Sequence, residues 1–339
     1  HKNWRDLVDP ANELSHDYTC PQAFRTPIPE ESYHTAYIRD RAKAYLRDTA
    51  AEPESRFTFI SFPDPHHPFN PPGRYWDMYA PEDFDLPVRY ADHKNPPLPL
   101  AQAHADFEAG VMHEVKQTGF MASDAHIREA MALTAGMVTM IDDAVGEIVE
   151  TLRESGRYEK TVIIFNSDHG DYLGDFNLLL KGAWPKDAIT RVPMIWSDPA
   201  DRSTRTCKTL ASTIDLSATI LDRAGLRPYH GMQGLSLLSA LQGGESDRDS
   251  LLIEYNDSSR RMGFDPPARV RAMVTDEWHL AVYKDEEWGE LYDRRNDPRH
   301  LRNLWNLPGY ADTKADLFLA LMHHLIAQMD ESPQSQRLA

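Results

Sequence analysis

Two short segments place histidines beside groups that could bind a metal ion or an anion. In NSDHG, Asp168 and His169 follow the apolar run TVIIF, and in SFPDPHHPF, His66 and His67 follow the apolar run RFTFISF. A carboxylate oxygen and a neutral imidazole nitrogen are common ligands of divalent cations. Lys181 follows in LLLKG, and its ammonium group could hold the oxygens of a tetrahedral anion. These residue types together indicate hydrolysis of a sulfate or phosphate ester.

The chemistry of each side chain suggests a role. A histidine near the leaving oxygen can donate a proton as a general acid, which contributes roughly 10²–10⁴ in rate. A metal held by Asp168 and His169 would offset charge on the oxyanion and activate the nucleophile. Taken singly, the residues also have ordinary explanations: Asp168 as a turn or helix-capping residue, His66 as a packed loop histidine and Lys181 as a surface lysine.

The apolar runs before the two histidine segments indicate the strands that would bring them together. Residues 162–165 are continuously apolar, which is typical of a strand buried on both faces in a parallel sheet. Residues 56–62 form a second β-prone run that stops at Pro63. Ligands of open α/β sheets bind beyond the carboxyl ends of the strands. If the two strands are neighbours, the carboxylate, the imidazoles and the ammonium group converge in one cleft.

The rest of the pattern predicts an open α/β sheet with helices on both faces, followed by a small C-terminal subdomain. Three helices and a further strand are expected at 36–50, 128–154, 213–226 and 191–196. After about residue 245, four short strand-like runs and a helix at 311–329 indicate an antiparallel sheet with one covering helix. We therefore divide the chain into a catalytic domain, 1–247, and a C-terminal subdomain, 248–339.

The composition excludes several classes of partner. The 339 residues include 36 basic and 53 acidic side chains, which gives a formal charge of −17. A strongly acidic surface repels nucleic acid and anionic membrane, and no apolar run approaches membrane-spanning length. A small anionic substrate stays compatible, because a local cationic pocket or a metal outweighs distant charge. A homo-oligomer is also compatible with this composition.

The cysteines and the first residues say little about chemistry. Cys20 and Cys207 form no disulfide framework, and Cys20 lacks the strand–helix context that activates a thiolate. The opening residues have no signal-peptide core and no initiator Met, so we expect that sequence precedes His1. The cytoplasm is the expected compartment, with the periplasm as the alternative.

Several segments, in a fixed order over nearly the whole chain, resemble the sulfatases of the alkaline phosphatase superfamily. FISFPDPHHPFNPPGRYWDMY is similar to the family's catalytic-histidine segment, and VIIFNSDHGDYLGDFNLLLKG is similar to its metal-and-lysine segment. Four further segments resemble the family's accompanying helices, strand and C-terminal subdomain: GMVTMIDDAVGEIVETL, TRVPMIW, STIDLSATILDRAGL and GELYDRRNDPRHLRNLW. The resemblance implies an alkaline-phosphatase-like α/β/α sandwich with a mostly parallel central sheet.

The resemblance also implies a role for each matched residue. Asp168 and His169 correspond to two of the metal ligands, with Ca²⁺ favoured. Mn²⁺ and Zn²⁺ are alternatives because His169 supplies a nitrogen, a feature that also resembles the related phosphonate monoester hydrolases. His66 corresponds to the histidine that contacts the ester and assists departure of the leaving group. Lys181 corresponds to the lysine that contacts the sulfate.

Two short segments depart from the family pattern near the site. GDFN at 174–177 and WPKD at 184–187 differ from the residues common in relatives, so the substrate preference stays open. We predict that His67 and Trp184, together with Lys181, contact a substrate that is a small-molecule, saccharide or aryl sulfate ester.

The family's nucleophile motif, Cys or Ser followed by x-Pro-x-Arg, is absent from the 339 residues, and so is its first acidic metal pair. We expect both before His1, where the Cys or Ser would become formylglycine. The leading interpretation is a metal-dependent sulfuric ester hydrolase that cleaves a sulfate monoester, with this chain alone inactive. The alternatives are a phosphonate monoester or phosphodiester hydrolase on the same scaffold, and a catalytically incomplete binding domain.

Overall fold

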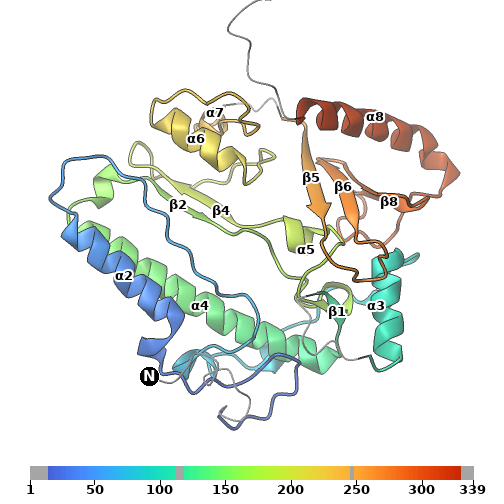
Figure 1. The fold of residues 1–339 in the computed structure, drawn as a ribbon, viewed down its shortest axis with the longest axis horizontal. Coiled ribbons are helices and arrows are strands. Elements are labelled where there is room, and N and C mark those ends of the chain that lie inside the picture. The colour runs from blue at the N-terminus through green and yellow to red at the C-terminus, as the bar shows by residue number, and fades with distance from the viewer. Residues whose placement is uncertain (1–13, 112–117, 245–247, 330–339) are drawn as a thin grey trace, which may run out of the picture.

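A computed structural model describes residues 14–111, 118–244 and 248–329 (Figure 1). The α-helices are α2 His34–Asp48, α3 Leu98–Glu108, α4 Asp124–Glu154, α5 Asp187–Thr190, α6 Asp215–Arg223, α7 Leu238–Leu241 and α8 Ala311–Ala327. The strands are β1 Phe120–Met121, β2 Ile163–Asn166, β3 Leu178–Leu179, β4 Met194–Ser197, β5 Ser250–Asn256, β6 Arg269–Thr275, β7 Trp278–Tyr283 and β8 Gly289–Asp293. Short 3₁₀ turns lie at Glu30–Ser32, Gly73–Tyr75, Pro81–Asp83, Tyr90–Asp92, Tyr158–Lys160, Asp175–Asn177 and Pro308–Tyr310.

The long helix α4 confirms the helix expected at 128–154, and it begins four residues earlier. Ser123 caps it, because the Ser123 Oγ accepts a hydrogen bond from the backbone N–H of His126 at 3.2 Å. The predicted apolar stripe is largely buried, at Leu133, Met137, Met140, Ile141, Ile148 and Leu152. A continuous stripe at helical spacing has to be covered, and here it faces the core.

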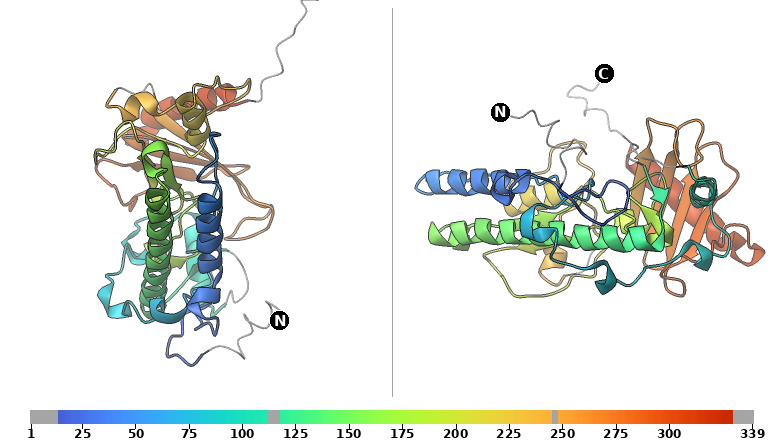
Figure 2. Two further views of the ribbon diagram at one scale, coloured as in Figure 1. Left: turned by 90° about the vertical axis from the view of Figure 1, so that its left-hand side faces the viewer. Right: turned by 90° about the horizontal axis from the view of Figure 1, so that it is seen from below.

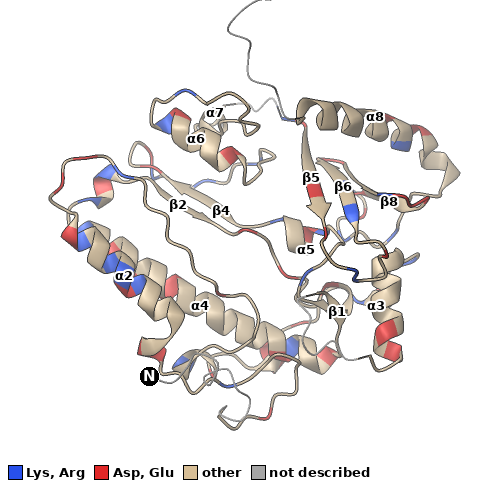
Figure 3. Cartoon of the chain, viewed as in Figure 1, with Lys and Arg blue, Asp and Glu red and all other residues tan. Residues whose placement is uncertain are grey.

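Helix α2 runs along α4, and the two lie side by side in both views of Figure 2. Arg39 and Lys43 of α2 pair with Glu147 of α4, and Arg47 pairs with Glu154 at 3.3 Å. Figure 3 shows the basic residues of α2 along this helix. Partly exposed ion pairs of this kind contribute little each to stability.

The small sheet formed by β2 and β4 differs from the expected parallel sheet. Its strands are antiparallel, with Ile163 opposite Ser197 and Asn166 opposite Met194, and every residue of β2 is only half-buried. In the described part of the chain, no parallel ladder joins two strands, although Ala23 and Phe69 form an isolated parallel bridge. The apolar run of β2 is therefore a strand, as predicted, but it is not buried on both faces.

The strand expected at 56–62 is not formed. This segment is not hydrogen-bonded in a ladder with any other described strand, and Phe57 and Phe59 are 71% and 80% exposed. High β-propensity reflects packing against neighbouring strands, and here no described strand supplies that packing. Its final residues nevertheless lead directly into the histidine segment.

The C-terminal subdomain matches the prediction. Its strands lie in the order β5–β6–β7–β8, each antiparallel to the next. Helix α8 covers this sheet, and Leu317 and Leu321 of the helix pack against Met273, Leu280 and Leu291 of the strands. The other face of the sheet is also covered, because Val270, Ala272 and Ala281 lie in a second buried cluster. The residue at which the subdomain begins stays a prediction.

Among the described residues, no helix has both the length and the apolar character needed to cross a membrane.

Candidate functional site

The structure brings His66, Lys181 and His169 into direct contact. The Lys181 Nζ lies 2.8 Å from the Nε2 of His66 and 2.8 Å from the Nε2 of His169. The His67 ring stacks on the His66 ring with 3.9 Å between centroids. His66 and Lys181 are 115 residues apart in sequence, so the predicted convergence of the two segments is confirmed. We call these four residues the Lys181 cluster.

The protonation of the cluster follows from its hydrogen bonds. The Nδ1 of His66 lies 2.6 Å from the carbonyl oxygen of His67, and the Nδ1 of His169 lies 2.8 Å from that of Gly170. A carbonyl only accepts, so each Nδ1 carries the proton and donates. Each Nε2 is then an acceptor for the Lys181 ammonium, which has three N–H groups. Both Nε2 lone pairs therefore point to one place, and Lys181 occupies it.

Burial and charge act together on the cationic groups. The pKa of Lys181 is lowered, mainly by burial, while the nearby carboxylates Asp168 and Asp171 oppose that change. The pKa of His67 is lowered to about 4, first by burial and then by the neighbouring His66, Lys181 and His169. His67 is therefore neutral near pH 7, which limits the positive charge in the cluster.

The half-buried carboxylate of Asp171 positions Lys181. Leu178, Leu179 and Leu180 are fully buried beside it, so this run anchors the chain in the core. Asp171 accepts hydrogen bonds from the backbone N–H groups of Leu173 and Leu180, each at 2.9 Å. These two bonds close the loop between His169 and Lys181 and so fix the separation of the two side chains.

Gly170 fixes the other side of this loop. Its N–H donates to the Ile189 carbonyl at 2.8 Å, and an added Cβ would lie 1.9 Å from the carbonyl oxygen of Ala188. Only a glycine permits this close approach of two backbones. The approach holds the peptide that carries His169 against α5.

The histidine loop is held by the start of α2. The buried carboxylate of Asp64 accepts a hydrogen bond from the Thr35 hydroxyl, and it lies 2.9 Å from the Nε2 of His34. The N–H of His66 donates to the Pro63 carbonyl at 3.2 Å. His66 therefore keeps its place beside Lys181 although residues 56–62 form no strand.

Asp168 and His169 suit part of a metal site. The side chain of Asp168 is 85% exposed, and its Oδ2 lies 3.6 Å from the Nε2 of His169. The Nδ1–H of His169 bonds to a carbonyl, so Nε2 is the nitrogen that would bind a metal in place of its present hydrogen bond with Lys181. In the described part of the chain, no third His, Cys, Asp or Glu joins these two within 4.8 Å. The pair would thus provide only part of the coordination.

Trp184, which we predicted to contact substrate, lies fully buried in the core with Tyr172 and Phe176. Its indole N–H donates to Glu290 at 2.8 Å, and the Tyr172 hydroxyl donates to its carbonyl oxygen at 2.9 Å. A direct contact between Trp184 and substrate stays a prediction. These contacts link the segment that carries Lys181 to β8 of the C-terminal sheet.

Sequence reasoning missed a buried ion pair next to this tryptophan. Lys186 Nζ lies 2.9 Å from the Oε2 of Glu290, and both side chains are almost completely buried. Burial lowers the pKa of Lys186, and the pKa of Glu290 is lowered to about 2, where Lys186 and hydrogen-bond donors outweigh the opposing effect of burial. The sequence shows Lys186 in WPKD and Glu290 inside an expected strand. Neither position indicates that the two side chains would pair.

The chain has a mixed α/β fold with a four-stranded antiparallel C-terminal sheet and a covering helix. The chain belongs to the sulfatase family, whose defining sequence pattern it matches over residues 4–226. A second pattern, that of the N-sulphoglucosamine sulphohydrolase C-terminal region, matches residues 182–328.

Curated relatives are about one quarter identical to the chain. The multifunctional alkaline phosphatase superfamily protein PehA of Trinickia caryophylli is 28% identical over 327 residues, which cover 91% of this chain and 62% of PehA. An arylsulfatase of Clostridium perfringens is 27% identical over 313 residues, covering 91% of this chain and 60% of the relative. The chain thus spans about 60% of the length of these curated relatives.

Solved structures confirm the fold. A phosphonate monoester hydrolase from Silicibacter pomeroyi superposes with a TM-score of 0.78 at 22% identity, covering 96% of this chain and 69% of that structure. The phosphonate monoester hydrolase of Agrobacterium radiobacter gives a TM-score of 0.77 at 22% identity, with 96% and 66% covered. The alkaline-phosphatase-like fold expected from the sequence is therefore confirmed.

Proposed function

We propose that the chain supplies the anion-binding and leaving-group half of an active site that hydrolyses a sulfate monoester. The observation that supports this proposal is the position of Lys181 Nζ, 2.8 Å from the Nε2 atoms of both His66 and His169. Three groups that can carry positive charge or donate protons meet there. An anion with tetrahedral oxygens would take over the hydrogen bonds that Lys181 now donates to the imidazoles.

Lys181 holds the ester in this proposal. Its ammonium group donates to the non-bridging oxygens, where negative charge grows as the ester bond breaks. Hydrogen-bond donors that point at developing negative charge contribute strongly to the rate, and loss of one typically lowers kcat by a factor of about 10²–10³. The lowered pKa of Lys181 favours this exchange, because partial burial leaves the ammonium short of solvation until an anion arrives.

His66 acts beside the leaving oxygen. When the anion accepts the Lys181 N–H groups, the Nε2 of His66 is released, and it can take up a proton from water and pass it to the departing alkoxide or phenoxide. The Nδ1–H bond to the His67 carbonyl holds the ring in the orientation that this transfer needs. His67 stays neutral and stacks on His66, so its contribution is to packing and substrate contact.

Asp168 and His169 would hold one divalent metal, for which Ca²⁺ is favoured and Mn²⁺ or Zn²⁺ are alternatives. Such an ion offsets charge on the sulfate oxygens and activates the nucleophile when bound. The nucleophile in our proposal is a formylglycine, and no residue of the 339 matches its motif. The proposal therefore concerns the half of the site that this chain contains.

A phosphonate monoester is the second candidate substrate. The supporting observation is the imidazole of His169, since nitrogen ligation suits metals other than Ca²⁺, and a relative with 28% identity bears the name multifunctional. Both substrates present non-bridging anionic oxygens and a leaving oxygen to Lys181 and His66. Parallel assays on an aryl sulfate and a phenyl phosphonate ester separate the two reactions.

The test uses the full-length protein that contains this chain, supplied with Ca²⁺ or Mn²⁺. Lys181→Met should lower kcat/KM on the favoured ester by about 10²–10³, whereas Lys208→Met, at an exposed lysine, should leave it unchanged. His66→Gln should lower kcat more for poor leaving groups than for good ones. An unchanged kcat/KM in Lys181→Met would contradict the anion-binding role, and an equal loss for all leaving groups would remove the acid role of His66.

A further inference from the structure

A second set of metal-ligating side chains lies apart from the Lys181 cluster, at the C-terminal subdomain. Asp187 is the first residue of α5, His279 belongs to β7, and His300 follows β8. One ligand atom from each of the three lies within 4.8 Å of the other two. These atoms come from three separate segments, so their proximity is a product of the fold rather than of local sequence.

The two imidazoles are buried and incompletely hydrogen-bonded. His279 is 1% exposed and His300 is 3% exposed. In the described part of the chain, neither the Nδ1 of His279 nor the Nε2 of His300 has a hydrogen-bond partner. The rings lie nearly perpendicular, with 5.0 Å between centroids. A buried polar atom without a partner costs about 1–3 kcal/mol, and two such atoms beside a carboxylate indicate a ligand shared among them.

The charge around the set suits a cation with a preference for nitrogen. Both rings are buried, and burial favours the neutral imidazole, which offers a nitrogen lone pair to a metal. The positive charge of Lys186 is offset by Glu290 at 2.9 Å. With Lys186 and Glu290 offsetting each other, the carboxylate of Asp187 gives the set a net charge of about one negative unit. Asp187 pairs with Arg294 at 3.8 Å, and Arg294 is a weak competitor for the carboxylate at that distance.

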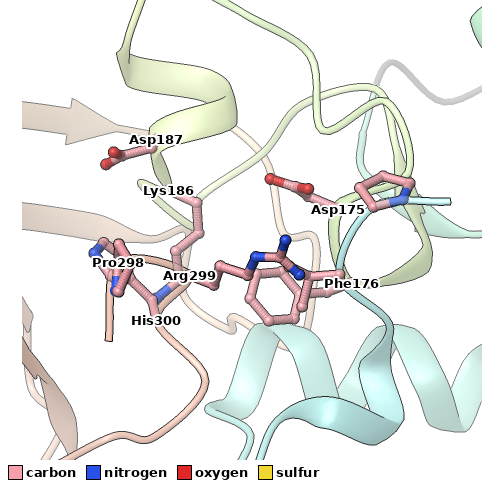
Figure 4. Close-up of a pocket in the computed structure, with 9 residues that line it drawn as sticks. Asp175, Phe176, Lys186, Asp187, Pro298, Arg299 and His300 are labelled. Atoms are coloured by element: carbon pink, nitrogen blue, oxygen red, sulfur yellow. The ribbon is translucent and has the colours of Figure 1, made fainter. Parts of the chain in front are cut away.

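A pocket opens beside the set and provides access. Its volume is about 240 Å³, and its wall includes Lys186, Asp187, Arg299 and His300. Figure 4 shows Lys186, Asp187 and His300 along one side of the pocket, opposite Asp175. A metal bound by three protein ligands keeps an open position for water, and this pocket can supply that water.

We propose that Asp187, His279 and His300 bind one divalent transition-metal ion of the Zn²⁺ type. Two imidazole nitrogens and one carboxylate match the ligands that Zn²⁺ takes, whereas Ca²⁺ takes oxygen ligands almost entirely. The ion fastens α5 to β7 and to the segment after β8. Because α5 also receives the peptide of Gly170 through the Ile189 carbonyl, the ion steadies the loop that carries His169 and Lys181.

The experiment measures Zn²⁺ binding with the ligands of the other candidate metal site removed. The full-length protein carrying Asp168→Asn and His169→Gln is stripped with a chelator and titrated with Zn²⁺, and bound metal is counted by elemental analysis after gel filtration. We expect one equivalent of Zn²⁺. Adding Asp187→Asn or His300→Gln should abolish it, and adding His323→Gln, at an exposed histidine of α8, should not.

Two further readouts separate a site from loss of folding. Zn²⁺ should raise the melting temperature of the parent and of the His323→Gln protein but not that of the Asp187→Asn protein. Co²⁺ in place of Zn²⁺ should give visible absorption bands that Asp187→Asn removes. Asp187 is 35% exposed, so its amide variant is compatible with folding. Absence of a bound equivalent in the parent, or equal stoichiometry in the Asp187→Asn protein, would overturn the proposal.

Discussion

The buried pair Lys186–Glu290 allows the sharpest prediction of stability. Glu290 accepts hydrogen bonds from Trp184 at 2.8 Å, from Tyr292 at 2.7 Å and from Tyr283, and it pairs with Lys186 at 2.9 Å. Glu290→Gln keeps the shape of the side chain but removes its charge. The Lys186 ammonium, which is 3% exposed, would then be buried without a counterion.

The expected loss is about 3–5 kcal/mol of unfolding free energy, the usual cost of breaking a buried ion pair from one side. Unfolding entropy of about 2.1 cal/mol/K per residue gives about 0.7 kcal/mol/K for 339 residues. The melting temperature at pH 7 should therefore fall by about 4–7 °C, as measured by calorimetry. Glu254→Gln, at an exposed ion pair with Arg271, is the matched control and should cost less than about 1 kcal/mol.

The double variant Lys186→Met, Glu290→Gln tests the reason for this loss. It removes the unpaired charge, so it should be more stable than Glu290→Gln alone. A Glu290→Gln protein as stable as the Glu254→Gln control would refute the reasoning. So would a double variant no more stable than the single one, because the cost would then come from lost hydrogen bonds rather than from the buried ammonium.

Two further predictions concern the Lys181 cluster and its supports. Gly170→Ala should destabilise the protein and reduce ester hydrolysis, because its Cβ would lie 1.9 Å from the Ala188 carbonyl oxygen; Gly146→Ala in α4, where nothing lies within 4 Å, should stabilise it by about 0.5–1 kcal/mol. Chemical denaturation of both proteins checks this, and similar effects of the two substitutions would contradict it. The pKa of His67 is about 4 when folded and about 6.5 when unfolded, so the unfolded state binds more protons between these values. Unfolding free energy should fall as the pH drops from 6.5 to 4, and His67→Gln should flatten that slope in urea titrations; an unchanged slope would exclude His67 as its source.

Local patterns predicted the elements whose formation depends on local sequence. The apolar stripe of α4 and the four strand-like runs separated by turn signals are local patterns, and both elements appear where expected. The pairing of β2 with β4 could not be predicted, because a continuous apolar run does not state which strand will lie beside it. For the same reason, 56–62 is β-prone but forms no ladder with any described strand.

The candidate site was predicted in part, and one premise was wrong. His66, Lys181 and His169 do meet, yet His66 is placed by Asp64 and α2 rather than by the end of a strand. The support from Glu290 could not be read from sequence, since Trp184 and Glu290 lie 106 residues apart. The same holds for His279 and His300, whose burial next to Asp187 is a long-range result of folding.

The exposed apolar side chains of segment 56–62 and of β4 affect how copies of the chain associate in solution. Phe57, Phe59 and Ile195 are all more than half exposed, and exposed apolar groups on extended backbone favour contact between copies. The net charge of −17 opposes that contact through mutual repulsion. Repulsion between exposed charges reaches about 10 Å in 0.1 M salt and about 3 Å in 1 M salt, whereas apolar contact does not weaken in this way. Raising the ionic strength should therefore favour association between copies of this chain at a fixed protein concentration.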